Sequence, residues 1–136
     1  MRIVGQNERI LREVYARFPE VGPEAVIAIL ADDVVWRSSG ASNRLDTAGV
    51  WQGRAGAVAF FAKASFDWKI QSFDVQEFYA AGDGHFAVHL LIALESSATD
   101  KVVRVDVIHL VTMESGKITR HVEIFDTAPA ERATRL

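Results

Sequence analysis

A stretch of alternating apolar and polar residues near the end of the chain constrains the fold more than any other feature. Residues 102–113 and 118–126 are rich in β-branched and aromatic side chains, and Ser115-Gly116 between them is typical of a two-residue hairpin turn. The pattern predicts two antiparallel strands. Successive side chains of a strand point to opposite faces, so the register of this hairpin decides which side chains meet.

Two carboxylates lie within this apolar hairpin. We expect Glu114 and Lys117 to flank the turn. That register places Ile108 opposite Glu123. Asp106 then lies on the same face as Glu123, at a cross-strand diagonal of roughly 7–8 Å. An acid within an apolar surface needs a partner or a functional role, so this face is the candidate site.

Composition narrows the function classes. The 136 residues suit one domain, spanning 1–136 with a core of about 6–127 and a polar, frayed tail at 128–136. A net charge of -3 without a basic run argues against a nucleic-acid partner. The absence of cysteine excludes disulfides and thiolate sites, and no histidine spacing predicts a metal site. Apolar runs fall short of the ~18 residues of a membrane span, so we expect no membrane partner. With no signal peptide, we expect a cytoplasmic protein.

The order of predicted elements indicates an α+β fold. Apolar residues recur at helical spacing over 6–18, 23–30 and 55–65. Strands are predicted at 34–36, 69–80 and 85–95, followed by the hairpin. Helices followed by a run of strands are typical of this class. The small and polar residues 38–49 read as a mobile loop long enough to act as a lid.

Four short motifs carry a resemblance to a known family. They are the segment 30–36 (LADDVVW), 53–56 (GRAG) ahead of Phe60-Phe61, 116–118 (GKI) and 123–126 (EIFD). In this order and spacing, over about residues 6–127, the chain resembles the nuclear transport factor 2-like superfamily and its SnoaL-like group. The resemblance implies a curved antiparallel sheet forming a cone around three helices, with a pocket on the concave face. It also implies a homodimer through the convex face, and no cofactor.

The catalytic residues of three related kinds of enzyme can be compared with the candidate residues of this chain. SnoaL-type polyketide cyclases carry an acid/base Asp at the position of Glu123. Tyr15 matches an oxyanion-binding Tyr of the steroid isomerases, but their base falls on Ser38 and their oxyanion Asp on Ile108. The segment 104–106 (RVD) is similar to a limonene-type epoxide hydrolase motif but lies one strand too late.

The resulting hypothesis is an acid/base enzyme of isomerase, cyclase or hydrolase type that acts on a hydrophobic carbonyl substrate. Glu123 is its acid/base, with Asp106 as modulator and Tyr15 as a hydrogen-bond donor. The expected lining of the ligand pocket is Trp36, Trp51, Phe61, Ile108, Leu110 and Phe125. His109 is expected on the face opposite the pocket. Two alternatives stay open: a non-catalytic protein that binds a small hydrophobic ligand, and a dimerisation domain with a vestigial pocket.

Overall fold

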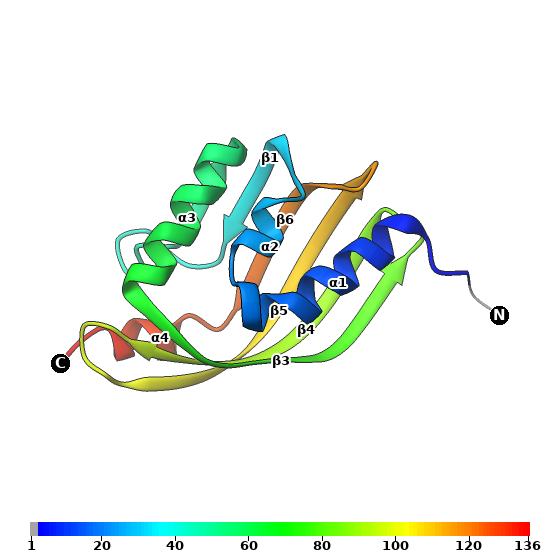
Figure 1. The fold of residues 1–136 in the computed structure, drawn as a ribbon. Helices are drawn as coiled ribbons and strands as arrows, with labels where there is room; N and C mark the ends of the chain where they lie inside the picture. Colours follow the sequence, from blue (N-terminus) through cyan, green and yellow to red (C-terminus); the bar gives the residue numbers. More distant parts are fainter. Residues whose placement is uncertain (1–2) are drawn as a thin grey trace.

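The computed structural model describes residues 3–136 and has an α+β architecture with one six-stranded sheet (Figure 1). The helices are α1 (Gln6–Val21), α2 (Glu24–Ile27), α3 (Gly53–Asp67) and α4 (Ala128–Ala133). The strands are β1 (Leu30–Ser38), β2 (Gly49–Gln52), β3 (Trp68–Ala81), β4 (His85–Ser96), β5 (Val102–Glu114) and β6 (Lys117–Phe125). Helices α1, α2 and α3 lie over one face of the curved sheet, which confirms the expected fold class.

The sheet order is β2-β1-β6-β5-β4-β3. Strands β3 to β6 form an antiparallel meander, whereas β1 pairs with β6 in parallel. The sheet is therefore mixed rather than wholly antiparallel as expected. This parallel pair brings the end of β1 beside the last third of β6, so Ser38 is paired with Glu123 although 85 residues separate them.

Helix α1 is anchored by the turns at one end of the meander. Asp83, in the β3–β4 turn, accepts hydrogen bonds from the backbone N–H groups of Asn7 (3.1 Å) and Glu8 (3.0 Å), which have no intrahelical partners. The Asn7 side chain accepts a hydrogen bond of 2.7 Å from the N–H of Gly116 in the β5–β6 turn. These contacts fix α1 relative to both hairpins and so orient Tyr15 two turns further along.

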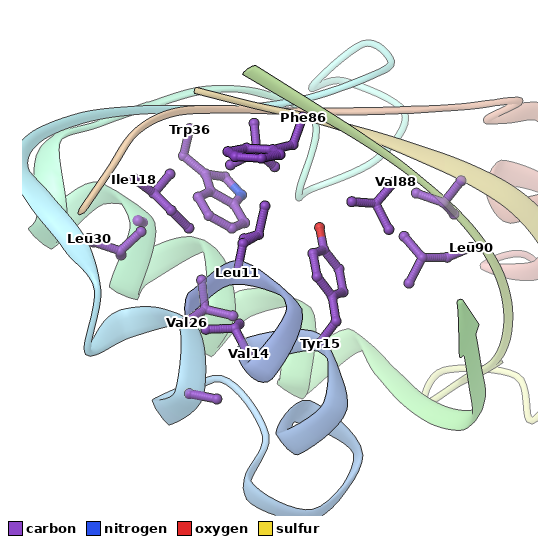
Figure 2. Close-up of a cluster of buried hydrophobic side chains, with 14 of the residues drawn as sticks. Leu11, Val14, Tyr15, Val26, Leu30, Trp36, Phe86, Val88, Leu90 and Ile118 are labelled. Atoms are coloured by element: carbon purple, nitrogen blue, oxygen red, sulfur yellow. The ribbon is translucent and has the colours of Figure 1, made fainter. Parts of the chain in front are cut away.

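The core lies between the helices and the sheet. Figure 2 shows Leu11, Val14 and Tyr15 of α1 directed towards side chains of the strands, with the Tyr15 hydroxyl on the side of the sheet. Leu11 and Leu30 are each 1% exposed. Full burial of such a side chain contributes roughly 1.5–3 kcal/mol to folding. No helix within residues 3–136 is long and apolar enough to cross a membrane.

The register expected for the β5–β6 hairpin is wrong by one residue. Glu114 does face Lys117 across the turn, but an irregularity between Thr112 and Met113 then shifts the pairing. His109 rather than Ile108 therefore lies opposite Glu123. An extra residue in one strand moves the following side chains to the other face, so the shift exchanges the two faces of β5 relative to β6.

Several expected boundaries also differ. The second helix is only Glu24–Ile27, and the strand predicted at 34–36 begins at Leu30. The tail predicted to be frayed contains α4, which buries Ala130 and Ala133. The stretch predicted as a mobile loop buries Leu45, and Ala130 packs with it beside Trp68 and Phe125. This loop and α4 thus hold each other by apolar contacts that neither sequence pattern indicates by itself.

Candidate functional site

A cavity of about 470 Å³ lies between the concave face of the sheet and helices α1, α2 and α3. Most of the side chains that line it are apolar, and many are aromatic. They include Leu11, Val14, Phe18, Val26, Trp36, Phe60, Phe61, Phe73, Val105, Val107 and Phe125. A volume of this size and an apolar wall with a few polar groups are typical of small-molecule sites, which span about 300–1,000 Å³.

One carboxylate lines this cavity, that of Glu123 on β6. The hydroxyl of Ser38 donates a hydrogen bond of 3.0 Å to its Oε1. No lysine or arginine is among the residues of the described chain, 3–136, that line the cavity. The anion is therefore stabilised by neutral donors and neighbouring histidine rather than by a permanent cation.

His109 lies beside this carboxylate and joins it to Tyr15. The Tyr15 hydroxyl is 2.7 Å from Nδ1 of His109. The other ring nitrogen, Nε2, lies 3.5 Å from Oε2 of Glu123. Within residues 3–136 this Nε2 has no hydrogen-bond partner, so its contact with Glu123 is an electrostatic one at close range. The three side chains come from α1, β5 and β6 and meet in the wall of the cavity.

The direction of the Tyr15–His109 hydrogen bond follows from electrostatics. Burial, with a further contribution from the charge of Glu123, raises the pKa of Tyr15 far above its usual value, so the phenol stays protonated and can donate. If the ring proton of neutral His109 were on Nδ1, the lone pair of Nε2 would face a carboxylate. We therefore assign the Nε2–H tautomer, in which Tyr15 donates to Nδ1 and the Nε2–H faces Glu123.

A second histidine lies next to His109. The ring of His121 stacks on Trp36 with centroids 3.7 Å apart and an interplanar angle of 2°. Its centroid is 4.5 Å from that of His109. Burial, and to a smaller extent the neighbouring His109, lowers the pKa of His121 well below its usual value, so this ring is neutral near pH 7. It supplies a flat wall without adding charge.

The structure brings together some of the predicted site residues and separates others. Tyr15, Trp36, Phe61, Glu123 and Phe125 all line the cavity. The other four residues of the expected site do not line it: Trp51, Asp106, Ile108 and Leu110.

Three of these four lie on the convex face because of the register shift. Asp106 is 75% exposed there, and its Oδ1 is 2.7 Å from Nε2 of His89. Its expected place beside Glu123 is wrong, as are the cavity positions expected for Ile108 and Leu110. Trp51 instead packs edge-on against Phe60 and donates a hydrogen bond to the Thr47 carbonyl, which leaves it behind the lining.

The arrangement places a proton acceptor and a proton donor side by side in an apolar space. Glu123 Oε2 can accept a proton, and His109 Nε2–H, 3.5 Å away, can donate a hydrogen bond. Across residues 3–136, no group of three or more histidine, cysteine or acidic side chains is placed to hold a metal ion. The chemistry that these residues offer is proton transfer.

The comparisons with known proteins agree with the architecture. A family model described as a SnoaL-like domain matches residues 11–121, most of the chain. The chain belongs to the SnoaL-like family. A comparison with curated protein sequences found no significant match.

Solved structures share the fold of this SnoaL-like chain. An NTF2-like protein of unknown function from Burkholderia pseudomallei is 21% identical over 98% of this chain and 100% of that one, with a TM-score of 0.87. An NTF2-like protein from Burkholderia xenovorans is 26% identical over 95% of each chain, with a TM-score of 0.80. TerC, co-crystallised with polyporic acid, is 23% identical over 96% of this chain and 98% of its own, with a TM-score of 0.79.

The position expected for His109, on the face opposite the pocket, is wrong, because the ring lines the cavity. The signal for its inward position is the alternation within β5, where every second residue from Val105 to Met113 is buried and the series is apolar apart from His109. These buried residues form the face of β5 that packs on the core, so His109, the one polar residue among them, also points into the core. The sequence does not indicate the link between Ser38 and Glu123, because this link depends on the parallel β1–β6 pairing.

Proposed function

We propose that this SnoaL-like chain is an acid/base enzyme that removes a proton next to a carbonyl group of an uncharged, hydrophobic substrate. Glu123 is the base, and His109 is the hydrogen-bond donor to the carbonyl oxygen. The observation that carries this proposal is the pairing of Glu123 Oε2 with His109 Nε2 at 3.5 Å in the wall of a largely apolar cavity.

The two groups match the two reacting ends of a carbonyl compound. The carboxylate takes the proton from the carbon next to the carbonyl, and the C–H electron pair forms a carbon–carbon double bond. The carbonyl π electrons move to oxygen, where the Nε2–H stabilises the developing negative charge. Return of the proton to another carbon completes an isomerisation, and attack of the enolate on a second carbonyl carbon completes a cyclisation.

The apolar lining supports an uncharged substrate. A carboxylate without a neighbouring lysine or arginine repels an anionic ligand, and the aromatic wall favours a flat apolar one. TerC, which shares the fold, was co-crystallised with polyporic acid, and we propose that the cavity of this chain likewise binds a small organic molecule. The same lining would serve a non-catalytic binding protein, so the test must measure proton transfer itself.

A general carbon acid tests the proposal without the natural substrate. In the ring opening of 5-nitrobenzisoxazole, a base removes the ring C–H proton while the N–O bond breaks, which gives a nitrile and a coloured phenolate. We expect the protein to accelerate this reaction and Glu123→Gln to lose about 10²–10⁴-fold of the acceleration, the usual contribution of a general base. Asp106→Asn, a carboxylate-to-amide change on the convex face, is the matched control and should keep the full rate.

Equal rates for the wild-type protein and Glu123→Gln would overturn the proposed role of Glu123. A wild-type protein that binds 5-nitrobenzisoxazole, as shown by quenching of tryptophan fluorescence, but leaves its reaction rate unchanged would favour the non-catalytic alternative.

A further inference from the structure

We propose that Ser38 is a positioning residue that holds the Glu123 carboxylate through Oε1 and so directs Oε2 towards His109. The catalytic consequence rests on the proposed function of Glu123, whereas the effect on the carboxylate itself does not. The proposal gives a role to a buried hydroxyl at the end of β1.

Ser38 is placed for this contact by the backbone. It is the last residue of β1 and is paired in register with Glu123 across the parallel β1–β6 ladder. The next residue, Ser39, also binds β6. Its N–H (3.0 Å) and its hydroxyl (2.7 Å) both donate to the backbone carbonyl oxygen of Glu123. The Glu123 residue is thus held through its backbone by Ser39 and through its side chain by Ser38.

The burial of the hydroxyl makes its partner important. Ser38 is 2% exposed, and its Oγ donates to Oε1 of Glu123 at 3.0 Å. A buried hydroxyl without a hydrogen bond is costly, and so is a carboxylate that has lost its water. Because no lysine or arginine among residues 3–136 lines the cavity, the Ser38 hydroxyl supplies the hydrogen bond that replaces water at Oε1.

This hydrogen bond gives the two carboxylate oxygens of Glu123 different partners. Oε1 is occupied by Ser38, and Oε2 lies next to His109 Nε2. A proton taken from a substrate therefore arrives at Oε2, next to the group that stabilises the product oxygen.

Three variants separate positioning from general structural damage. Ser38→Ala removes the hydroxyl, Ser38→Thr restores a hydroxyl at the same atom position, and Ser39→Ala removes a neighbouring hydroxyl that binds the backbone carbonyl instead of the carboxylate. A structural role would make Ser38→Ala and Ser39→Ala alike. Positioning predicts that they differ.

The readout is the hydrogen bonding of the Glu123 carboxylate, followed by infrared spectroscopy of protein with ¹³C-labelled glutamate carboxyl groups. The band of Glu123 is identified by its loss in Glu123→Gln, so no turnover is needed. In Ser38→Ala we expect the frequencies of the symmetric and antisymmetric carboxylate stretches to move, because Oε1 loses its hydrogen bond. Ser38→Thr and Ser39→Ala should keep the wild-type frequencies.

The 5-nitrobenzisoxazole reaction then shows whether catalysis follows. Its kcat should fall roughly ten- to a hundredfold in Ser38→Ala alone, the usual effect of a misplaced catalytic group, with KM unchanged. Unmoved carboxylate bands in Ser38→Ala, or an equal movement in Ser39→Ala, would overturn the positioning role. If the bands move but Glu123→Gln keeps full activity, the positioning role stands and the proposed base is wrong.

Discussion

The hydroxyl of Tyr15 lies 2.7 Å from Nδ1 of His109, and this contact sets the orientation and the tautomer of the histidine. Tyr15 comes from α1, which the two hairpin turns anchor at its start, and His109 comes from the middle of β5. The hydrogen bond therefore couples the packing of α1 on the sheet to the orientation of His109 in the cavity wall. A shift of α1 would move the donor and release the ring.

Removing the Tyr15 hydroxyl should reduce both stability and activity. Tyr15→Phe leaves Nδ1 of a buried histidine without its donor, and an unsatisfied buried polar group costs about 1–3 kcal/mol. Urea unfolding should show a loss of this size in the free energy of unfolding. Ser97→Ala is the control because it removes an exposed hydroxyl outside the cavity, and it should change the free energy by less than about 0.5 kcal/mol. Equal stabilities of the two variants would contradict the role of the contact.

The buried His121 predicts how stability depends on pH. Its pKa is lowered in the folded protein by burial and by the neighbouring His109, so the unfolded chain takes up a proton first as the pH falls. Stability from this group is complete above the unfolded pKa of about 6.5 and is lost below it, by at most about 1.4 kcal/mol per pH unit.

Replacing His121 by Phe tests this pH dependence. His121→Phe keeps an aromatic ring on Trp36 but cannot take up a proton, so it should lose less stability between neutral and mildly acidic pH than the wild type does. His85→Phe changes an exposed histidine and serves as the control. The account of His121 is contradicted if urea unfolding at a series of pH values gives His121→Phe the full wild-type slope.

The convex face of the sheet predicts self-association. We propose that a homodimer forms there, since Leu110 and Ile124 are 44% and 43% exposed beside Tyr79, and the three line one shallow groove. Leu110→Glu should convert the dimer to monomer in sedimentation equilibrium at micromolar concentration. Val58→Glu, at a 42% exposed position on α3, should leave the dimer intact. A monomeric wild-type protein would contradict the proposal.

The sequence was sufficient for the fold class and for most of the meander. Apolar periodicity and turn residues located α1, α3 and the strands β3 to β6, because each of these segments carries its own periodic pattern. The short strand β2, the true extent of β1 and helix α4 were missed. Each of these is stabilised by contacts with distant segments, such as the pairing of Trp36 with Trp51 in β1 and β2.

The site was predicted only in part. The prediction depended on the register assumed for the β5–β6 hairpin, and that register is wrong by one residue. Counting back from a regular two-residue turn put Asp106 beside Glu123, but the irregularity at Thr112 and Met113 shifts the pairing by one residue. The burial alternation of β5, with Val107 and His109 inward, gives the correct faces. When turn counting and alternation disagree, alternation is the safer guide, because exposing a whole apolar face costs more than one bulge.

The state of the His109 ring is the most direct test of the site as described. Nitrogen NMR of protein labelled at the histidine ring nitrogens reports which nitrogen carries the proton, and the His109 signals are identified by their loss in His109→Gln. We predict, at neutral pH, a proton on Nε2 and an unprotonated, hydrogen-bonded Nδ1, and a mixture of tautomers in Tyr15→Phe. A proton on Nδ1 of His109 in the wild-type protein, with Nε2 unprotonated, would contradict the assignment of His109 as the donor beside Glu123.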